Sequence, residues 1–157
     1  MEIVFHKESK IFHLFNQSIS YIIAVLPDGH IGQLYFGGRI HDRADFSYLL
    51  ELAPRDMASY PFTGDRTFSR GHVKQEYAVY GSGDYRYPAV SVLQENGSRL
   101  SDFCYESYEI ISGKPELRGL PATYSESDSD AETLVLKLYD TGIFREKDFS
   151  CHHPGYG

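Results

Sequence analysis

The sequence predicts an all-β fold built as an antiparallel β-sandwich, and three observations lead to it. The chain contains 13 Tyr and 10 Phe but no Trp, and aromatic side chains favour the pleated, half-buried surface of a sheet. Its 14 Gly and 7 Pro supply the turns that such strands need. With 41% hydrophobic and 24% charged residues, the composition is that of a globular chain, so a hydrophobic core is expected.

The first forty residues predict a run of strands, each bounded by turn-forming residues. In the third of them both faces are apolar, which is typical of a strand that is covered on both sides. After it, Pro27 and Gly29 predict a hairpin turn of type I with a bulge, because Gly29 can take the left-handed conformation. The predicted strands are Ile3–His6, Ile11–Phe15, Ser20–Leu26 and Ile31–Phe36.

The stretch from His41 to Tyr80 loses this pattern and predicts a long irregular excursion with scattered Gly, Pro and aromatic residues. Long loops are uncommon in compact domains unless they are functional or ordered by a partner. We therefore expect the function to lie here, in a segment that is mobile or held by another chain.

Regular structure is predicted to resume with strands at Pro88–Gln94 and Arg99–Ile111, joined at Asn96-Gly97 by a type I′ hairpin turn. For the later run Leu134–Leu138 the pattern leaves open a strand or a helix that begins at Ala131. The closing stretch, residues 144–157, shows no period and predicts a disordered or altered tail.

Charge and composition exclude several classes of protein. The 22 acidic against 15 basic residues give a net charge of −7, which repels a nucleic-acid backbone. No apolar run is long enough to span a membrane, and the first ten residues lack the features of a signal peptide. We therefore expect a cytoplasmic protein with no nucleic-acid or membrane partner. Cys104 and Cys151 are expected to be reduced thiols.

Two motif-like stretches fail on inspection. The alternating carboxylates from Glu126 to Glu132 suggest a calcium loop, but Ala131 stands where the EF-hand needs Gly. The sequence Gly81-Ser82-Gly83 begins like a dinucleotide fingerprint, but Arg86 occupies the third glycine position. The seven histidines share no metal-ligand spacing, so neither a cofactor nor a metal is predicted.

A set of short segments, in order, resembles the N-terminal domain of bacterial α-galactosidases of glycoside hydrolase family 36. The resemblance reaches from the start of the chain to about Asp140. The segments are Ile11-Phe12-His13-Leu14, Gly32-Gln33-Leu34-Tyr35-Phe36-Gly37, Asp65-Arg66-Thr67-Phe68-Ser69, Gln75-Glu76-Tyr77, Asp84-Tyr85-Arg86, Glu95-Asn96-Gly97-Ser98, Asp102-Phe103-Cys104-Tyr105, Gly113-Lys114-Pro115 and Gly119-Leu120-Pro121-Ala122-Thr123-Tyr124.

The resemblance implies a β-supersandwich domain, residues 1–143, here cut short of its full extent and lacking the catalytic (β/α)8 barrel. It favours a strand at Leu134–Leu138. In the family the barrel carries the aspartate nucleophile and the aspartate acid/base, so no catalytic residue is expected in this chain. The implied function is a non-catalytic domain that serves assembly and active-site shaping in an α-galactosidase that removes terminal α-D-galactosyl residues.

In tetrameric members of the family the N-terminal domain lies near a neighbouring subunit's active site, so the resemblance implies a homo-oligomer, expected to be a tetramer. The resemblance thereby implies three residues that bind the α-galactoside in that site: Arg66, with Glu51 or Asp56 as its acidic partner. The guanidinium fork suits sugar hydroxyls or a carboxylate. The alternative is an independent carbohydrate-binding module, which the absence of Trp disfavours.

Overall fold

The chain folds into two antiparallel sheets that face each other, which confirms the predicted all-β class. The structure is a computed structural model that describes residues 2–81, 83–115, 119, 127 and 130–141. The predicted tail at 144–157, Cys151 and most of the connector at 116–129 lie outside these residues. Among the described residues, no helix has the length and hydropathy needed to cross a membrane. The elements are β1 (Glu2–His6), β2 (Ile11–Phe15), β3 (Ile19–Val25), β4 (Ile31–Gly38), a 3₁₀ turn η1 (Ser47–Leu49), β5 (Phe103–Ser112) and β6 (Glu132–Asp140).

The four strands predicted near the N-terminus form one sheet in the order β1-β2-β3-β4, with every neighbouring pair antiparallel. The turn between β3 and β4 is the one that Pro27 and Gly29 predict. Gly29 has φ 86°, and its N–H donates to the Leu26 carbonyl at 2.9 Å while the Leu26 N–H donates to the His30 carbonyl at 2.7 Å. These bonds define a type I turn closed by a glycine bulge.

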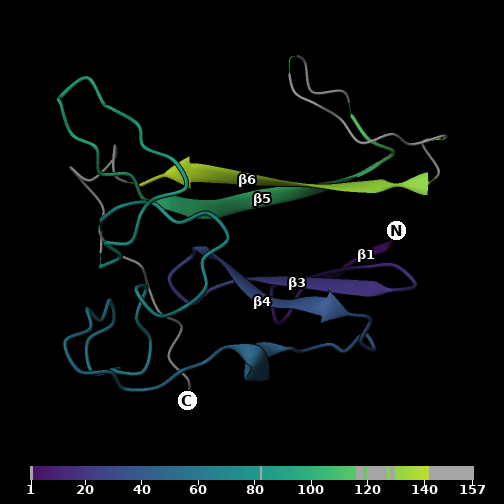
Figure 1. The fold of residues 1–157 in the computed structure, drawn as a ribbon, viewed down its shortest axis with the longest axis horizontal. Helices are drawn as coiled ribbons and strands as arrows, with labels where there is room; N and C mark the ends of the chain where they lie inside the picture. The colour runs from purple at the N-terminus through teal and green to yellow at the C-terminus, as the bar shows by residue number, and fades with distance from the viewer. Residues whose placement is uncertain (1, 82, 116–118, 120–126, 128–129, 142–157) are drawn as a thin grey trace.

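The second sheet pairs β5 with β6 and lies over one face of the first, as Figure 1 shows. Phe12 stacks on Phe5 with ring centroids 4.4 Å apart, and Tyr105 reaches the same cluster from β5. The run Leu134–Leu138 is a strand, not a helix, because its leucines line this interior. The core between the layers therefore comes from both ends of the chain.

The other face of the four-stranded sheet is covered by the beginning of the excursion. Phe46 is fully buried and packs on Ile11 and Ile22, with Leu49 of η1 beside them. Figure 1 places η1 and the chain that follows it beneath the sheet, on the side away from β5 and β6. This third layer confirms that β3 is covered on both faces.

Two predictions around Asn96 are wrong. Residues Pro88–Gln94 and 99–102 form no strand, and Val92 and Leu93 are exposed. The turn itself exists, but it is a second type I turn with a bulge: Gly97 has φ 81°, whereas Asn96 does not take the positive φ that a type I′ turn requires. β-favouring side chains without a partner strand do not make a sheet.

Candidate functional site

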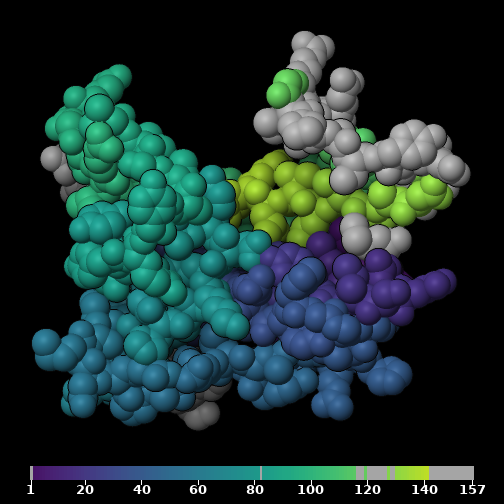
Figure 2. Space-filling view, in the orientation of Figure 1, coloured from purple at the N-terminus to yellow at the C-terminus, as the bar shows by residue number. Residues whose placement is uncertain are grey.

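A hollow between the excursion and the segment that follows it is the candidate functional site, and three loop segments form its wall. Its volume is about 330 Å³. Figure 2 shows the excursion and the chain after it, coloured blue to teal, gathered beside the two sheets. Gly71 and Gly83 allow the loops to approach closely, because a Cβ on Gly83 would lie 3.0 Å from the Ser59 hydroxyl. The hollow is lined by Asp56, Met57, Ala58, Ser59, Ser69, Gly71, His72, Gly83, Asp84, Tyr85 and Arg86.

At the floor of the hollow, Asp84 is only 2% exposed and is fully engaged by its neighbours. Its carboxylate accepts hydrogen bonds from the Arg86 Nη2 at 2.6 Å and from the Gln75 side-chain amide at 2.7 Å. Burial alone would raise the pKa of Asp84, but the Arg86 guanidinium outweighs burial and lowers it. The same Arg86 nitrogen donates to the Arg70 carbonyl at 2.9 Å, so this pair fixes the backbone at Arg70.

The side chain of Arg70 belongs to a closed ring of four charged residues beneath the hollow. Arg70 donates to Asp28 at 2.7 Å and to Asp102 at 2.9 Å. His30 lies between the same two carboxylates, 3.1 Å from Asp28 and 3.0 Å from Asp102. The four side chains are at most 12% exposed. The ring ties the β3–β4 turn to the excursion and to the chain that enters β5.

The two carboxylates hold His30 in its charged form. Burial lowers the pKa of His30, but the hydrogen bond to Asp102 and the contact with Asp28 outweigh burial and raise it to about 9. Burial would likewise raise the pKa of Asp102, but His30, Thr141 and Arg70 lower it well below its usual range. At neutral pH the ring therefore contains two anions and two cations, which is the arrangement that makes buried charge tolerable.

The ring also bears on the question of metal binding. The ligand atoms of His30, Asp102 and Cys104 lie within 4.8 Å of one another, and a cation could in principle bind there. Arg70, however, places its positive charge on the same Asp102 oxygen that His30 contacts. This charge opposes the binding of a metal cation, so we propose no metal centre here.

The structure separates the three site residues that the sequence predicts. Arg66 is exposed, with its guanidinium carbon 5.7 Å from the centre of the Tyr60 ring. Glu51 is exposed and pairs with Arg55, so Arg55, not Arg66, is its partner in this chain. Asp56 is exposed and lines the hollow. All three stand on the excursion, although no described contact joins Arg66 to either carboxylate.

Next to Asp56 the backbone is strained. Met57 has φ 63°, a left-handed conformation that costs a residue with a Cβ about 1–2 kcal/mol. Its side chain is fully exposed, and so is that of Tyr87, at 104% and 97%. Strain combined with exposed apolar side chains is characteristic of surfaces that act on a ligand or partner.

A separate chain of hydrogen bonds has the connectivity of a catalytic triad but not its access. His13 lies 3.0 Å from the Ser20 hydroxyl and 2.7 Å from Asp42. Ser20 and His13 are both fully buried, and the Ser20 oxygen accepts a bond from the Ile40 N–H at 3.1 Å. A nucleophile must reach its substrate, so we assign these hydrogen bonds the role of fastening the excursion to the sheet.

Reasoning from the sequence missed the charged ring, because its members are scattered. Asp28 and Arg70 are 42 residues apart, and Arg70 and Asp102 are 32 apart. No local spacing could reveal them. The one available signal was that Asp102 lies within a segment that carries the family resemblance, as do Gln75 and Asp84 at the floor of the hollow.

Comparison with known proteins places these features in a family. The family model described as "Glycosyl hydrolase family 36 N-terminal domain" matches residues 29–146. Alpha-galactosidase AgaA of Geobacillus stearothermophilus is 38% identical over 143 residues, which is 91% of this chain and 20% of that protein. Alpha-galactosidase Mel36A of Lactobacillus acidophilus is 36% identical over 88% of this chain and 19% of its own length.

Solved structures agree with this match. The α-galactosidase from Lactobacillus brevis has a TM-score of 0.82 at 36% identity over 88% of this chain and 19% of its own. A variant of AgaA in complex with raffinose has a TM-score of 0.76 at 39% identity, over 85% of this chain and 18% of its own. This chain thus spans about a fifth of the length of the relatives it matches.

Proposed function

Because this chain belongs to the glycosyl hydrolase family 36 N-terminal domains, we propose that it is the non-catalytic N-terminal domain of an α-galactosidase. The enzyme would hydrolyse terminal α-D-galactosyl groups on a catalytic barrel in the same polypeptide. The observation that carries the proposal is the pattern of coverage. Relatives named α-galactosidases match 88–91% of this chain with only 19–20% of their own length.

In this enzyme the domain serves assembly and active-site shaping within a cytoplasmic homo-oligomer, which we propose is a tetramer. The excursion is the segment suited to reach a neighbouring subunit. Its root is held by the charged ring and by buried Phe46 and Phe68, whereas Met57 and Tyr48 are exposed. A fixed root with an exposed apolar surface favours contact with another chain.

Arg66, Glu51 and Asp56 are the residues we propose to act on substrate in the neighbouring subunit's site. Arg66 offers a planar fork of donors, which can bridge two sugar hydroxyls. Asp56 offers an acceptor at the rim of the hollow. Glu51 would position Arg55, with which it pairs, and would contact the sugar only if that surface pair opens, which costs little.

The test compares the 157-residue chain with the polypeptide in which it precedes a family 36 barrel. We expect no hydrolysis of an aryl α-galactoside by the chain alone and turnover by the longer polypeptide. Turnover by the chain alone that is abolished by changing one of its own carboxylates would overturn the proposal. The second candidate is an independent carbohydrate-binding module. If the domain is such a module, its deletion should leave the activity of the barrel on the aryl α-galactoside unchanged.

A further inference from the structure

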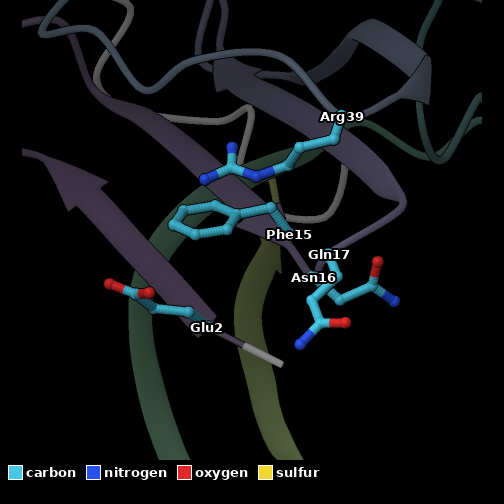
Figure 3. A pocket seen from close by; sticks show the side chains of 5 residues that line it. All are labelled: Glu2, Phe15, Asn16, Gln17 and Arg39. Carbon is cyan, nitrogen blue, oxygen red and sulfur yellow. The ribbon is translucent and has the colours of Figure 1, made fainter.

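A second hollow lies at the end of the four-stranded sheet that leads into the β2–β3 turn. Its volume is about 470 Å³, which falls within the range of about 300–1,000 Å³ that is usual for small-molecule sites. The five residues that line it come from the start of β1, the end of β2 with the turn after it, and the residue after β4. They are Glu2, Phe15, Asn16, Gln17 and Arg39, and Figure 3 shows them together.

Backbone pairing holds these residues in a fixed frame. Glu2 and Phe15 are cross-strand partners in β1 and β2. The Arg39 N–H donates to the Ser18 carbonyl at 2.9 Å, which ties the end of β4 to the turn. A site on paired strands is more ordered than one on a free loop.

The turn also orients the Asn16 side chain. Its carboxamide oxygen accepts bonds from the N–H groups of Ser18 at 2.8 Å and Ile19 at 2.9 Å. Because this oxygen is occupied, the carboxamide NH₂ group is the part that can donate to a ligand. Gln17 beside it makes no side-chain hydrogen bond to the part of the chain that the structure describes, so it can both donate and accept.

Arg39 and Glu2 bring opposite charges to the hollow. The Arg39 guanidinium carbon lies 3.7 Å from the centre of the Phe15 ring, a stacking that restricts the side chain. Figure 3 shows Arg39 over one face of the Phe15 ring and the Glu2 carboxylate on the opposite side of that ring. Stacking occupies the face of the guanidinium, and Nη1 at its edge donates to the Ile40 carbonyl. The remaining edge N–H groups lie in the guanidinium plane and are the ones that can donate to a ligand.

This set of groups selects a neutral ligand with many hydroxyls. Asn16 and Arg39 offer hydrogen-bond donors, and Glu2 offers an acceptor. The Gln17 carboxamide offers both. Such a set matches hydroxyl groups, which both donate and accept. Arg39 and Glu2 line the same hollow and their charges cancel, so the hollow favours neither an anion nor a cation. We propose that this hollow binds a sugar unit of a neutral oligosaccharide, as an auxiliary site separate from hydrolysis.

The auxiliary site shares no residue with the surface of Arg66, Glu51 and Asp56, so it does not rest on the proposed function. All four of its polar side chains are exposed. Substitution of Gln17 or Arg39, the two that the test replaces, should leave the melting temperature almost unchanged. Few contacts and an exposed setting lead us to expect a dissociation constant in the millimolar range, about −4 kcal/mol of binding free energy.

The test is a titration of the ¹⁵N-labelled 157-residue chain with raffinose up to about 50 mM, a concentration that saturates a site of low millimolar affinity. The side-chain amide signals of Asn16 and Gln17 report on the hollow directly. We expect these signals to shift saturably. Arg39→Lys, which keeps the charge but loses the fork, and Gln17→Ala should each weaken binding by about fivefold or more. Glu95→Gln, an exposed carboxylate on the distant turn at Asn96, is the matched control and should change nothing.

Three results would overturn the proposal. The first is a linear shift that does not saturate, which indicates no site. The second is an equal response of the same signals to sodium sulfate or tetramethylammonium chloride, which indicates that charge alone is recognised. The third is a saturable shift that Arg39→Lys and Gln17→Ala leave unchanged, which places the sugar elsewhere. The backbone amide spectrum of each variant is compared with that of the parent, so that a loss of folded structure is not mistaken for a loss of binding.

Discussion

Arg70 and His30 bridge the same two carboxylates, and together they close a buried ring across three distant segments. Each contacts both Asp28 and Asp102 within 3.1 Å. The ring lies where the hairpin turn, the excursion and the entry to β5 meet, and through the Arg70 backbone it is joined to Asp84 and Arg86 at the floor of the hollow. It is therefore the structural link between the sandwich and the candidate site.

The first prediction concerns two arginines that stand four residues apart. Arg70→Met should lower the free energy of unfolding by about 3 kcal/mol or more, because it leaves two buried carboxylates with one cation. Arg66→Ala should lower it by less than about 1 kcal/mol, because Arg66 is exposed and its contact with Tyr60 is a surface one. Urea denaturation of the two variants and the parent measures both values. Equal losses would show that the ring does not hold the excursion.

The second prediction concerns alkaline pH. The pKa of His30 is about 9 in the folded chain against 6.5 for an ordinary histidine. A raised folded pKa means that this contribution to stability is complete below pH 6.5 and is lost as the pH rises toward 9. The free energy of unfolding of the parent should therefore fall across this window, and His30→Gln should lack that fall. An imidazole that titrates at or below its ordinary value in a direct NMR titration would contradict the ring as described.

The same ring should respond to acid in the opposite sense. The pKa values of Asp28 and Asp102 are lowered from 3.8 by the groups that contact them. A lowered folded pKa contributes stability that is present above 3.8 and lost as the pH falls below it. Taken with His30, the ring should stabilise the domain most between about pH 4 and about pH 6.5. A denaturation series that is flat below pH 4 would show that other groups govern acid unfolding.

The third prediction concerns Met57. Met57→Gly should leave stability unchanged or raise it by up to about 1 kcal/mol, because glycine relieves the left-handed strain at some cost in chain entropy. Leu93→Gly is the matched control, an exposed apolar residue without a positive φ, and it should be neutral or destabilising. Thermal denaturation distinguishes the two. A clear loss of stability in Met57→Gly would mean that this side chain packs against something in solution.

The sequence was most informative where neighbours along the chain determine the structure. Apolar runs bounded by turn-forming residues predicted all four N-terminal strands. Pro27 with Gly29 predicted the type of the β3–β4 turn, because the hydrogen bonds of that turn join residues no more than four apart. The strand at Pro88–Gln94 was mispredicted because Val90 and Val92 favour a sheet locally, yet no strand pairs with them. Propensity cannot report the absence of a partner.

The candidate site was harder to predict for the same physical reason. The excursion was identified from its lost periodicity, and it is irregular. The segment was expected to be mobile or held by another chain, whereas Phe46 and Phe68 within it are buried by this chain itself. Three of the four contacts of the charged ring span 32 to 72 residues, which no local pattern records. The proposed contact between Arg66 and sugar requires a second subunit, so it stays a prediction.

The most direct test of the proposed function is the kinetics of Arg66→Ala in an α-galactosidase polypeptide that carries this domain. The parent, Arg66→Ala and Arg99→Ala, a matched exposed arginine, are assayed on raffinose, and the melting temperature of each is recorded. Loss of one charge-assisted contact in the transition state should lower kcat/KM by about tenfold in Arg66→Ala alone, with all three melting temperatures equal. Unchanged kinetics in Arg66→Ala, with or without a lowered melting temperature, would contradict a role for this surface in the neighbouring subunit's sugar site.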